Sequence, residues 1–273
     1  RYPWQDLERL GVTRTEVPQG DDGRIDVERV CDAVTERTRL VAVSHVQYAS
    51  GHRLALRPIA DKVHAVGGHL CVDAIQSVGA MPIDVQRDGV DFLSADGHKW
   101  MLGPEGCGVF YCHQDLCREL HPAIVGWLNM KDAHDYANYR FAFQDDARRF
   151  EPGSWNVPGC FALAASLELL LKVGLDEVWR RLDALTTRLC DGLTQRGMTV
   201  YTPRDDPDER SGIVVFDPPT IAGRDNAPAA VGGRLKREGI EIAVRSGRLR
   251  ASPHFYNTPQ QIDRLLEALV GSA

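Results

Sequence analysis

The sequence predicts an α/β protein: a mainly parallel sheet with flanking helices, followed by a small C-terminal α+β domain. Short β-branched apolar runs alternate with helix-like runs up to residue 112, and a similar alternation returns after residue 198. Two long helix-like stretches, residues 160–174 and 175–197, stand between these parts. Strands and helices that alternate at this spacing are typical of βαβ units. We therefore expect a large domain over residues 1–172 and a small domain over residues 173–273.

The large domain is expected to hold four strands, at residues 39–46, 69–75, 90–95 and 106–112. A helix should join the first two, because residues 56–67 carry a proline near their start, apolar residues at helical spacing and a glycine at their end. A sheet of this kind binds ligands beyond the carboxyl ends of its strands. Polar residues at those ends are therefore the candidates for a functional site.

The rest of the chain is less regular. Residues 113–157 show no clear pattern, and residues 202–212 form a polar surface connection. From residue 198 onward the tail carries short strand-like runs and closes on the helix-like run "TPQQIDRLLEALVG". This mixture is the basis for the small α+β domain.

Composition and charge argue against several classes of function. The net charge is −6 and no long basic run exists, which argues against nucleic-acid binding. No apolar run approaches the ~20 residues that span a membrane. The seven cysteines form no CxxC pair, so we expect no metal site and no disulfide framework, and a cytoplasmic protein with reduced thiols.

Two polar side chains stand at the predicted ligand edge. Asp73 closes "HLCVD", and Lys99 follows "VDFLSADGH". A lone aspartate at such a place is more often a helix cap, and a lone lysine is more often solvated. Together they suit pyridoxal phosphate (PLP), which needs a lysine for a Schiff base and a carboxylate that keeps the ring nitrogen protonated. Gln76 could reach the ring hydroxyl, and His98 could donate to the phosphate.

The sequence around these residues resembles a known family. "VDAIQSVGAMPIDV" and "VDFLSADGHKWMLGPEGCGVFY" are similar to the class V aminotransferases, and the resemblance continues through "RRFEPGSWN" and "RLRASPHFYNT". It implies the fold type I architecture of PLP-dependent transferases, in which a small domain closes over the substrate. It also implies reaction at the α-carbon of an amino acid, by transamination or a related lyase or epimerase reaction.

The resemblance assigns a role to each matching residue. Lys99 would carry the cofactor as a Schiff base and later move the α-proton, and Asp73 would pair with the pyridinium. Gln76 would bind the ring hydroxyl and His98 the phosphate.

The same resemblance implies substrate-binding residues and a partner. Arg250 matches the arginine that grips the substrate carboxylate, and Arg245 would lie near the same pocket. Ser154 matches a hydroxyl that the family lends to the phosphate of the neighbouring subunit. We therefore expect a homodimer with shared sites.

The sequence also departs from the family pattern. The glycine-rich phosphate loop and the aromatic residue that stacks on the ring are expected upstream of Arg1. Asp96 replaces a phosphate-binding serine of cysteine desulfurases and receives no role, and Tyr48 replaces an asparagine, either in the substrate pocket or in the core. Residues 213–273 contain no cysteine, which weakens the alternative of sulfur transfer from cysteine. A folded module without a cofactor is the third possibility.

Overall fold

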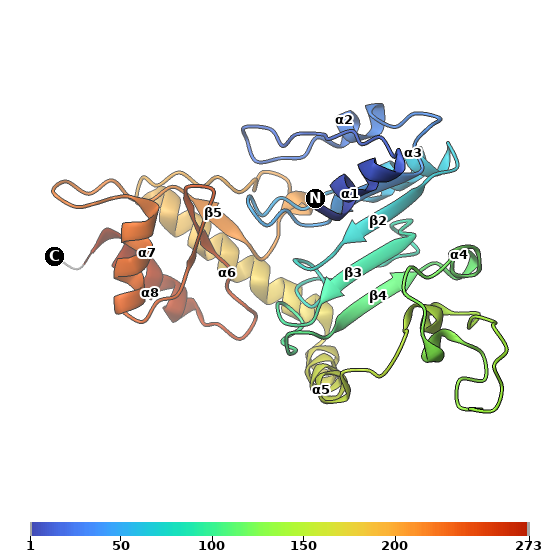
Figure 1. Ribbon diagram of the computed structural model, residues 1–273. Coiled ribbons are helices and arrows are strands. Elements are labelled where there is room, and N and C mark those ends of the chain that lie inside the picture. The colour runs from blue at the N-terminus through green and yellow to red at the C-terminus, as the bar shows by residue number, and fades with distance from the viewer. Residues whose placement is uncertain (1, 272–273) are drawn as a thin grey trace.

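A four-stranded sheet forms the centre of the larger part of the protein (Figure 1). The structure, a computed structural model, describes residues 2–271. Neighbouring strands follow one another in chain order. They are β1 (Leu40–Ser44), β2 (His69–Asp73), β3 (Phe92–Asp96) and β4 (Gly108–Cys112). The strands lie within or close to the ranges that the sequence predicts, and the mainly parallel sheet is confirmed.

The direction of β4 differs from that of the other strands. β1, β2 and β3 are parallel, whereas β4 pairs with β3 in the antiparallel sense. The reason is the connection, because residues 97–107 contain no helix that could carry the chain back to the opposite end of the sheet. A parallel pair needs a crossover of about a dozen residues or more, usually helical. The carboxyl ends of β2 and β3 therefore share one edge, from which the turn after β3 leads back along β4.

A short helix packs against the sheet. The predicted helix between the first two strands is α3 (Arg57–His64), with Pro58 in its first turn. Its buried residues Ile59, Ala60 and Val63 belong to the core of the sheet. The other short elements are α1 (Tyr2–Asp6), η1 (Leu7–Leu10), α2 (Val27–Asp32), α4 (Gln114–Glu119), η2 (Trp127–Asn129) and η3 (Ala147–Phe150).

Two long helices connect this part with the C-terminal part. α5 (Val157–Val173) and α6 (Leu175–Gln195) meet at Gly174 with a bend of 79°. Within residues 2–271 no single helix is long and apolar enough to span a membrane, and this bent pair satisfies only the length and composition criteria. Val178 and Leu182 of α6 pack into the core of the sheet, whereas Leu185 and later residues pack into a second core.

The second core lies in the C-terminal part, on one face of a three-stranded antiparallel sheet. The strands lie in the order β5 (Val214–Phe216), β7 (Arg248–Ala251) and β6 (Ala243–Arg245). α7 (Pro228–Arg237), α8 (Pro259–Val270) and the second half of α6 supply the rest of this core, and η4 (Pro207–Glu209) lies in the preceding polar loop. At residues 198–203, where strand-like residues begin the tail, the structure has only an isolated bridge from Val200 to Phe216.

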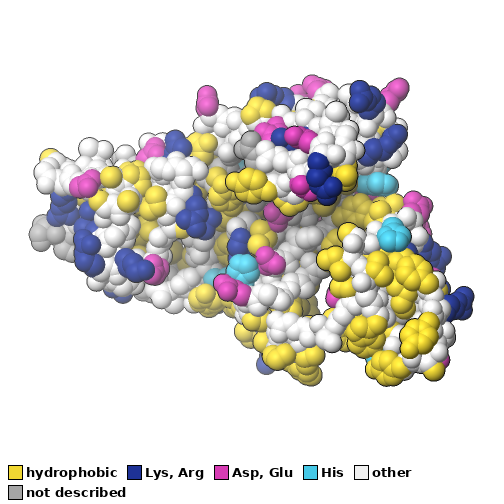
Figure 2. Space-filling model, in the orientation of Figure 1, with side chains coloured by type: hydrophobic (Ala, Val, Ile, Leu, Met, Phe, Trp, Pro, Cys, Tyr) yellow, Lys and Arg dark blue, Asp and Glu magenta, His cyan; other side chains and the backbone are white. Residues whose placement is uncertain are grey.

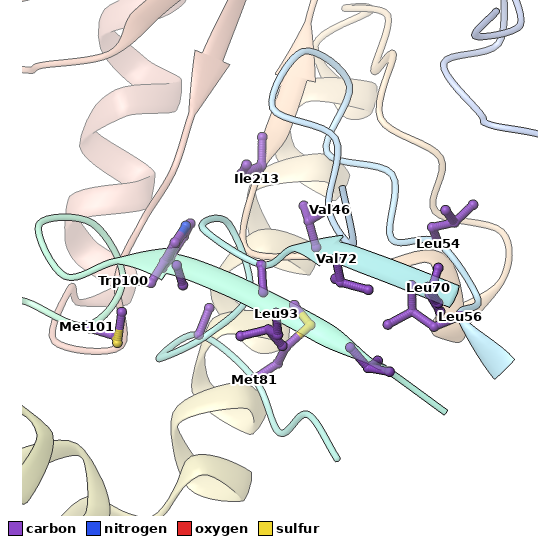
Figure 3. Close-up of a cluster of buried hydrophobic side chains, with 14 of the residues drawn as sticks. Val46, Leu54, Leu56, Leu70, Val72, Met81, Leu93, Trp100, Met101 and Ile213 are labelled. Carbon is purple, nitrogen blue, oxygen red and sulfur yellow. The ribbon is translucent and has the colours of Figure 1, made fainter. Parts of the chain in front are cut away.

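The two cores meet where the chain enters β5. Ile213 is fully buried in the core of the large sheet, together with Val46 and Val72 (Figure 3). Val215 is fully buried in the same core. Val214 and Phe216, which alternate with them along the strand, point into the second core. The division at residues 172 and 173 stays a prediction, and α6 and β5 each contribute residues to both cores.

A substitution at Gly79 tests the close packing around Trp100 that supports the site. Its φ is +93°, and an added Cβ would stand 2.5 Å from the Trp100 carbonyl oxygen. Gly79→Ala should lower the free energy of unfolding by about 1–3 kcal/mol through overpacking, in addition to backbone strain. Gly67→Ala is the matched control, because Gly67 has a φ of +74° and nothing within 4 Å of the added carbon. If urea denaturation gave the same loss in the free energy of unfolding for both variants, the contact with Trp100 would be unimportant.

Candidate active site

Lys99 lies in the turn that follows β3, at the edge where the parallel strands end. The turn is fixed by backbone hydrogen bonds: Gly97 N donates to the Cys107 carbonyl at 2.7 Å, and Gly103 N donates to the Gly97 carbonyl at 2.8 Å. Only glycine fits at position 97, because the backbone passes so close to Cys107 that an added Cβ would lie 2.7 Å from the Cys107 carbonyl oxygen. The lysine is therefore held by a rigid turn and is only partly exposed.

The charges around Lys99 come from both parts of the chain. Burial lowers the pKa of the Lys99 ammonium; Asp73 and Asp96 oppose this shift, and Arg250 and Arg245 add to it. A lysine with a lowered pKa has more of the neutral amine that can attack a carbonyl carbon. Figure 2 shows basic, acidic and histidine side chains gathered in the hollow between the two parts of the molecule.

Asp73 stands at the end of β2, next to the strand that leads to Lys99. One carboxylate oxygen, Oδ1, accepts a hydrogen bond from Ile75 N at 3.0 Å, and Ser44 Oγ lies 3.5 Å from Oδ2. The carboxylate remains exposed at the sheet edge. These contacts orient the carboxylate and leave it able to bind a protonated ring nitrogen.

Gln76 is buried, and the indole of Trp100 fixes the orientation of its amide. Trp100 Nε1 donates to Gln76 Oε1 at 3.0 Å. An indole N–H can only donate, so the oxygen must face Trp100 and the NH₂ group must face away. The amide therefore offers a donor, which suits the phenolic oxygen of the PLP ring.

Trp100 also connects this edge with the C-terminal part. The His254 ring lies 5.3 Å from the Trp100 ring, and His254 Nε2 donates to the Trp100 carbonyl at 3.1 Å. Phe255 N donates to His254 Nδ1 at 2.9 Å, so both ring nitrogens are bonded in the neutral form. Burial lowers the pKa of His254, in agreement with a neutral ring. The Trp100 ring also packs closely on Gly212, where an added Cβ would stand 2.6 Å from the ring.

Arg250 reaches from β7 to the loop after β1. Its Nη1 donates to the Tyr48 carbonyl at 3.1 Å, while its buried Nε has no hydrogen-bond partner among residues 2–271. A buried unpaired N–H of a guanidinium costs free energy that an incoming anion would recover. Arg245 is exposed on the neighbouring strand. The Tyr48 side chain is 56% exposed, so of the two predicted alternatives the structure excludes a packed core tyrosine.

Two other predicted ligands are exposed. His98 precedes Lys99 in the same turn, and Ser154 lies in the loop before α5. Their roles toward a phosphate, in the same subunit or in a neighbour, stay predictions. Within residues 2–271 no cluster of three His, Cys, Asp or Glu side chains could hold a metal.

Sequence reasoning missed Trp100, His254 and Ser44 as supports of the site. Trp100 and His254 stand inside the stretches that carry the family resemblance, so their position was a signal. Their contact joins residues 154 positions apart, and no sequence period could predict it.

The arrangement fits PLP and defines a class of protein. A carboxylate, an amide donor and a partly buried lysine stand at the carboxyl edge of a mainly parallel sheet, and an arginine of the C-terminal strands lies within electrostatic range of the lysine. A PLP-dependent enzyme of fold type I requires side chains of these kinds in these places.

The chain belongs to the class V aminotransferase family, whose pattern matches residues 1–265. A probable cysteine desulfurase of Methanothermobacter thermautotrophicus is 32% identical over 98% of this chain and 68% of its own length. A cysteine desulfurase of Pectobacterium atrosepticum is also 32% identical, over 98% of this chain and 66% of its own length. The chain thus spans about two thirds of the length of these relatives.

Solved structures agree with this membership. The apo cysteine desulfurase of Thermococcus onnurineus has a TM-score of 0.85 at 27% identity, over 97% of this chain and 67% of that one. The cystine C–S lyase C-DES, in complex with cysteine persulfide, has a TM-score of 0.83 at 25% identity, over 99% of this chain and 72% of that one. The predicted family and fold type are both confirmed.

The lowered pKa of Lys99 predicts a pH-dependent effect on stability. Folding lowers this pKa below the value of about 10.5 in the unfolded chain, so at neutral pH the protonated lysine destabilises the fold. Lys99→Met should therefore raise the melting temperature of the cofactor-free chain at pH 7. This increase in melting temperature should shrink as the pH rises from the pKa of Lys99 in the folded chain toward its pKa in the unfolded chain. Lys62→Met, at an exposed position on α3, is the control. A gain that is constant with pH would contradict the electrostatic explanation.

Proposed function

We propose that this chain acts as a PLP-dependent enzyme at the α-carbon of an amino acid, by transamination or a related lyase or epimerase reaction. One observation carries the proposal: Lys99 lies at the sheet edge, partly buried, within electrostatic range of both the Asp73 carboxylate and the Arg250 guanidinium. The membership of the family supports it.

Each side chain has a task in this proposal. Bound PLP supplies an electron sink for the α-carbon. Asp73 keeps a proton on the ring nitrogen, and the Gln76 NH₂ group donates to the ring hydroxyl. Arg250 binds the substrate carboxylate through Nε and its free N–H groups.

Lys99 has two tasks. When PLP is bound, the neutral amine of Lys99 would hold it covalently. Once released, the same amine takes the α-proton and returns it, as a general base and then a general acid. The lowered pKa of Lys99 favours both roles, because it raises the fraction of the neutral amine relative to an ordinary lysine.

A cysteine desulfurase activity is the second candidate, because several relatives carry that name. Direct attack on the substrate sulfur needs a thiolate that can reach it. The cysteine next before the C-terminal strands is Cys190, which is buried in α6, and burial raises its pKa to about 11. We therefore favour reactions that need no protein thiol.

We also propose a homodimer. Large apolar side chains are exposed on the irregular segment, residues 113–157, and on α5. We call the surface that these side chains form the apolar face. Figure 2 shows a dense apolar patch on part of it. A patch of this extent marks an interaction surface. Ser154 lies in the same segment, in line with a site shared between subunits. The exposed residues are Ile124, Val125, Trp127, Tyr136, Tyr139, Phe141, Trp155, Val157, Phe161, Leu169 and Leu171.

We further propose a cytoplasmic location. The seven cysteines, which form no disulfide, support this proposal.

Reductive labelling tests the role of Lys99. Incubation with PLP should give a yellow protein, and borohydride should remove the colour and leave a pyridoxyl group on Lys99. Lys99→Ala should abolish both the label and turnover. A label on Lys131 or Lys172 would refute the assignment, and a chain that never turns yellow would favour the module without a cofactor.

Because residues 213–273 contain no cysteine, we expect no protein persulfide to form during turnover. The PLP-loaded protein should release no sulfide from cysteine at catalytic rates through a protein persulfide, even with a reductant present, because a serine cannot replace the thiol. Sulfide assays and mass spectrometry provide the measurement. A persulfide on any of the seven cysteines, formed during turnover, would establish the second candidate.

The apolar face predicts the oligomeric state. The protein should sediment as a dimer, and Phe161→Asp combined with Leu171→Asp should shift it toward the monomer, since a buried carboxylate disfavours association. Leu10→Asp is the control, because Leu10 is 62% exposed but lies outside this face. A monomer at all working concentrations of the unmodified chain would count against the dimer.

A further inference from the structure

Three arginines lie on one face of the β6–β7 hairpin. Arg245 pairs with Arg248, and Arg250 follows Arg248 by two residues on the same strand. Paired residues and residues two apart point to the same side of a sheet. Val244 and Leu249 occupy the other face, where they contribute to the second core.

The arginine face is directed toward the large sheet. Arg250 pairs with Val215 of β5, so the two side chains share a face, and Val215 is buried in the core of the large sheet. The hydrogen bond from Arg250 Nη1 to the Tyr48 carbonyl also crosses to that part of the molecule. Lys99 lies within electrostatic range of both Arg245 and Arg250.

Among the described residues, a carboxylate neutralises one of the three arginines. Arg248 Nε donates to Asp217 Oδ1 at 2.9 Å, and its guanidinium lies 3.9 Å from the centre of the Tyr201 ring. Among residues 2–271, Arg245 and Arg250 form no ion pair, and their hydrogen bonds go to backbone carbonyls. Two positive charges thus remain side by side near the lysine, without a carboxylate of their own.

Two like charges at a diagonal position across a hairpin repel each other, and an anion between them removes that repulsion. The α-carboxylate of an amino acid supplies one negative charge, for which the buried Nε of Arg250 is the donor without a partner. Arg245 is left with no anion to bind unless the substrate carries a second one. The diagonal spacing of about 7–8 Å and the length of arginine side chains allow two separate acidic groups to be bound.

We propose that the pair Arg245 and Arg250 selects an acidic amino acid, with Arg250 on the α-carboxylate and Arg245 on an acidic group of the side chain. This inference rests on the proposed function and narrows its substrate class. Arg245 is a specificity-determining residue, and its loss should affect acidic substrates alone.

Binding to the PLP-loaded full chain tests the inference. L-Aspartate and L-glutamate are titrated against their uncharged amides, L-asparagine and L-glutamine, and the change in the visible absorption of the cofactor gives each Kd. The acids should bind about tenfold more tightly than the amides. Arg245→Gln should remove this preference by weakening the acids, with little change for the amides.

Arg248→Gln is the matched control, because Arg248 shares the hairpin face but is already paired with Asp217. It should leave the preference unchanged, whereas Arg245→Lys should keep part of it. Equal binding of acids and amides by the unmodified protein would overturn the inference. So would an equal loss for acids and amides in Arg245→Gln, which would place Arg245 on a group common to all substrates.

The outcomes also separate this inference from the function on which it rests. If amides change the spectrum and acids bind no better, only the substrate class is wrong. If the chain acquires no visible absorption with PLP, the proposed function fails, and the inference fails with it.

Discussion

The packing of Trp100 is the constraint on which the site depends. The indole donates to Gln76, the ring packs on Gly212, and the carbonyl accepts from His254. Because Trp100 directly follows Lys99, these contacts fix the lysine relative to the sheet edge and to the C-terminal part. The site is therefore built around one buried aromatic residue that contacts neither substrate nor cofactor in the proposed roles.

Much of the fold could be predicted from the sequence because local patterns determine it. Alternating apolar runs located β1 to β4, and the positions of Asp73 and Lys99 followed from where those runs end. The antiparallel direction of β4 was not predicted, because it depends on the short connection and not on the composition of the strand. The bond between Trp100 and Gln76 was also beyond prediction, since it joins two loops through tertiary packing.

The arginine face illustrates a property that only strand register can determine. In sequence, the two-residue spacing in "AVRSGRLRA" predicts that Arg248 and Arg250 share a side of their strand, but it does not show whether Arg245 shares that side. Ser246 and Gly247 both have a positive φ, of 49° and 75°, which is the conformation of a two-residue hairpin turn. This turn sets the pairing, and a shift of one residue would exchange the arginines with Leu249 and its apolar neighbours. The tight turn thus determines which side of the small sheet is charged.

The continuity of α6 has a consequence for cooperativity. Val178 and Leu182 belong to one core, and Leu189 and Leu193 belong to the other, on a single uninterrupted helix. Loss of the second core would leave apolar residues of that helix in water, and loss of the first would remove the support for its beginning. The two parts of the chain should therefore melt together as one unit, although each has a sheet of its own.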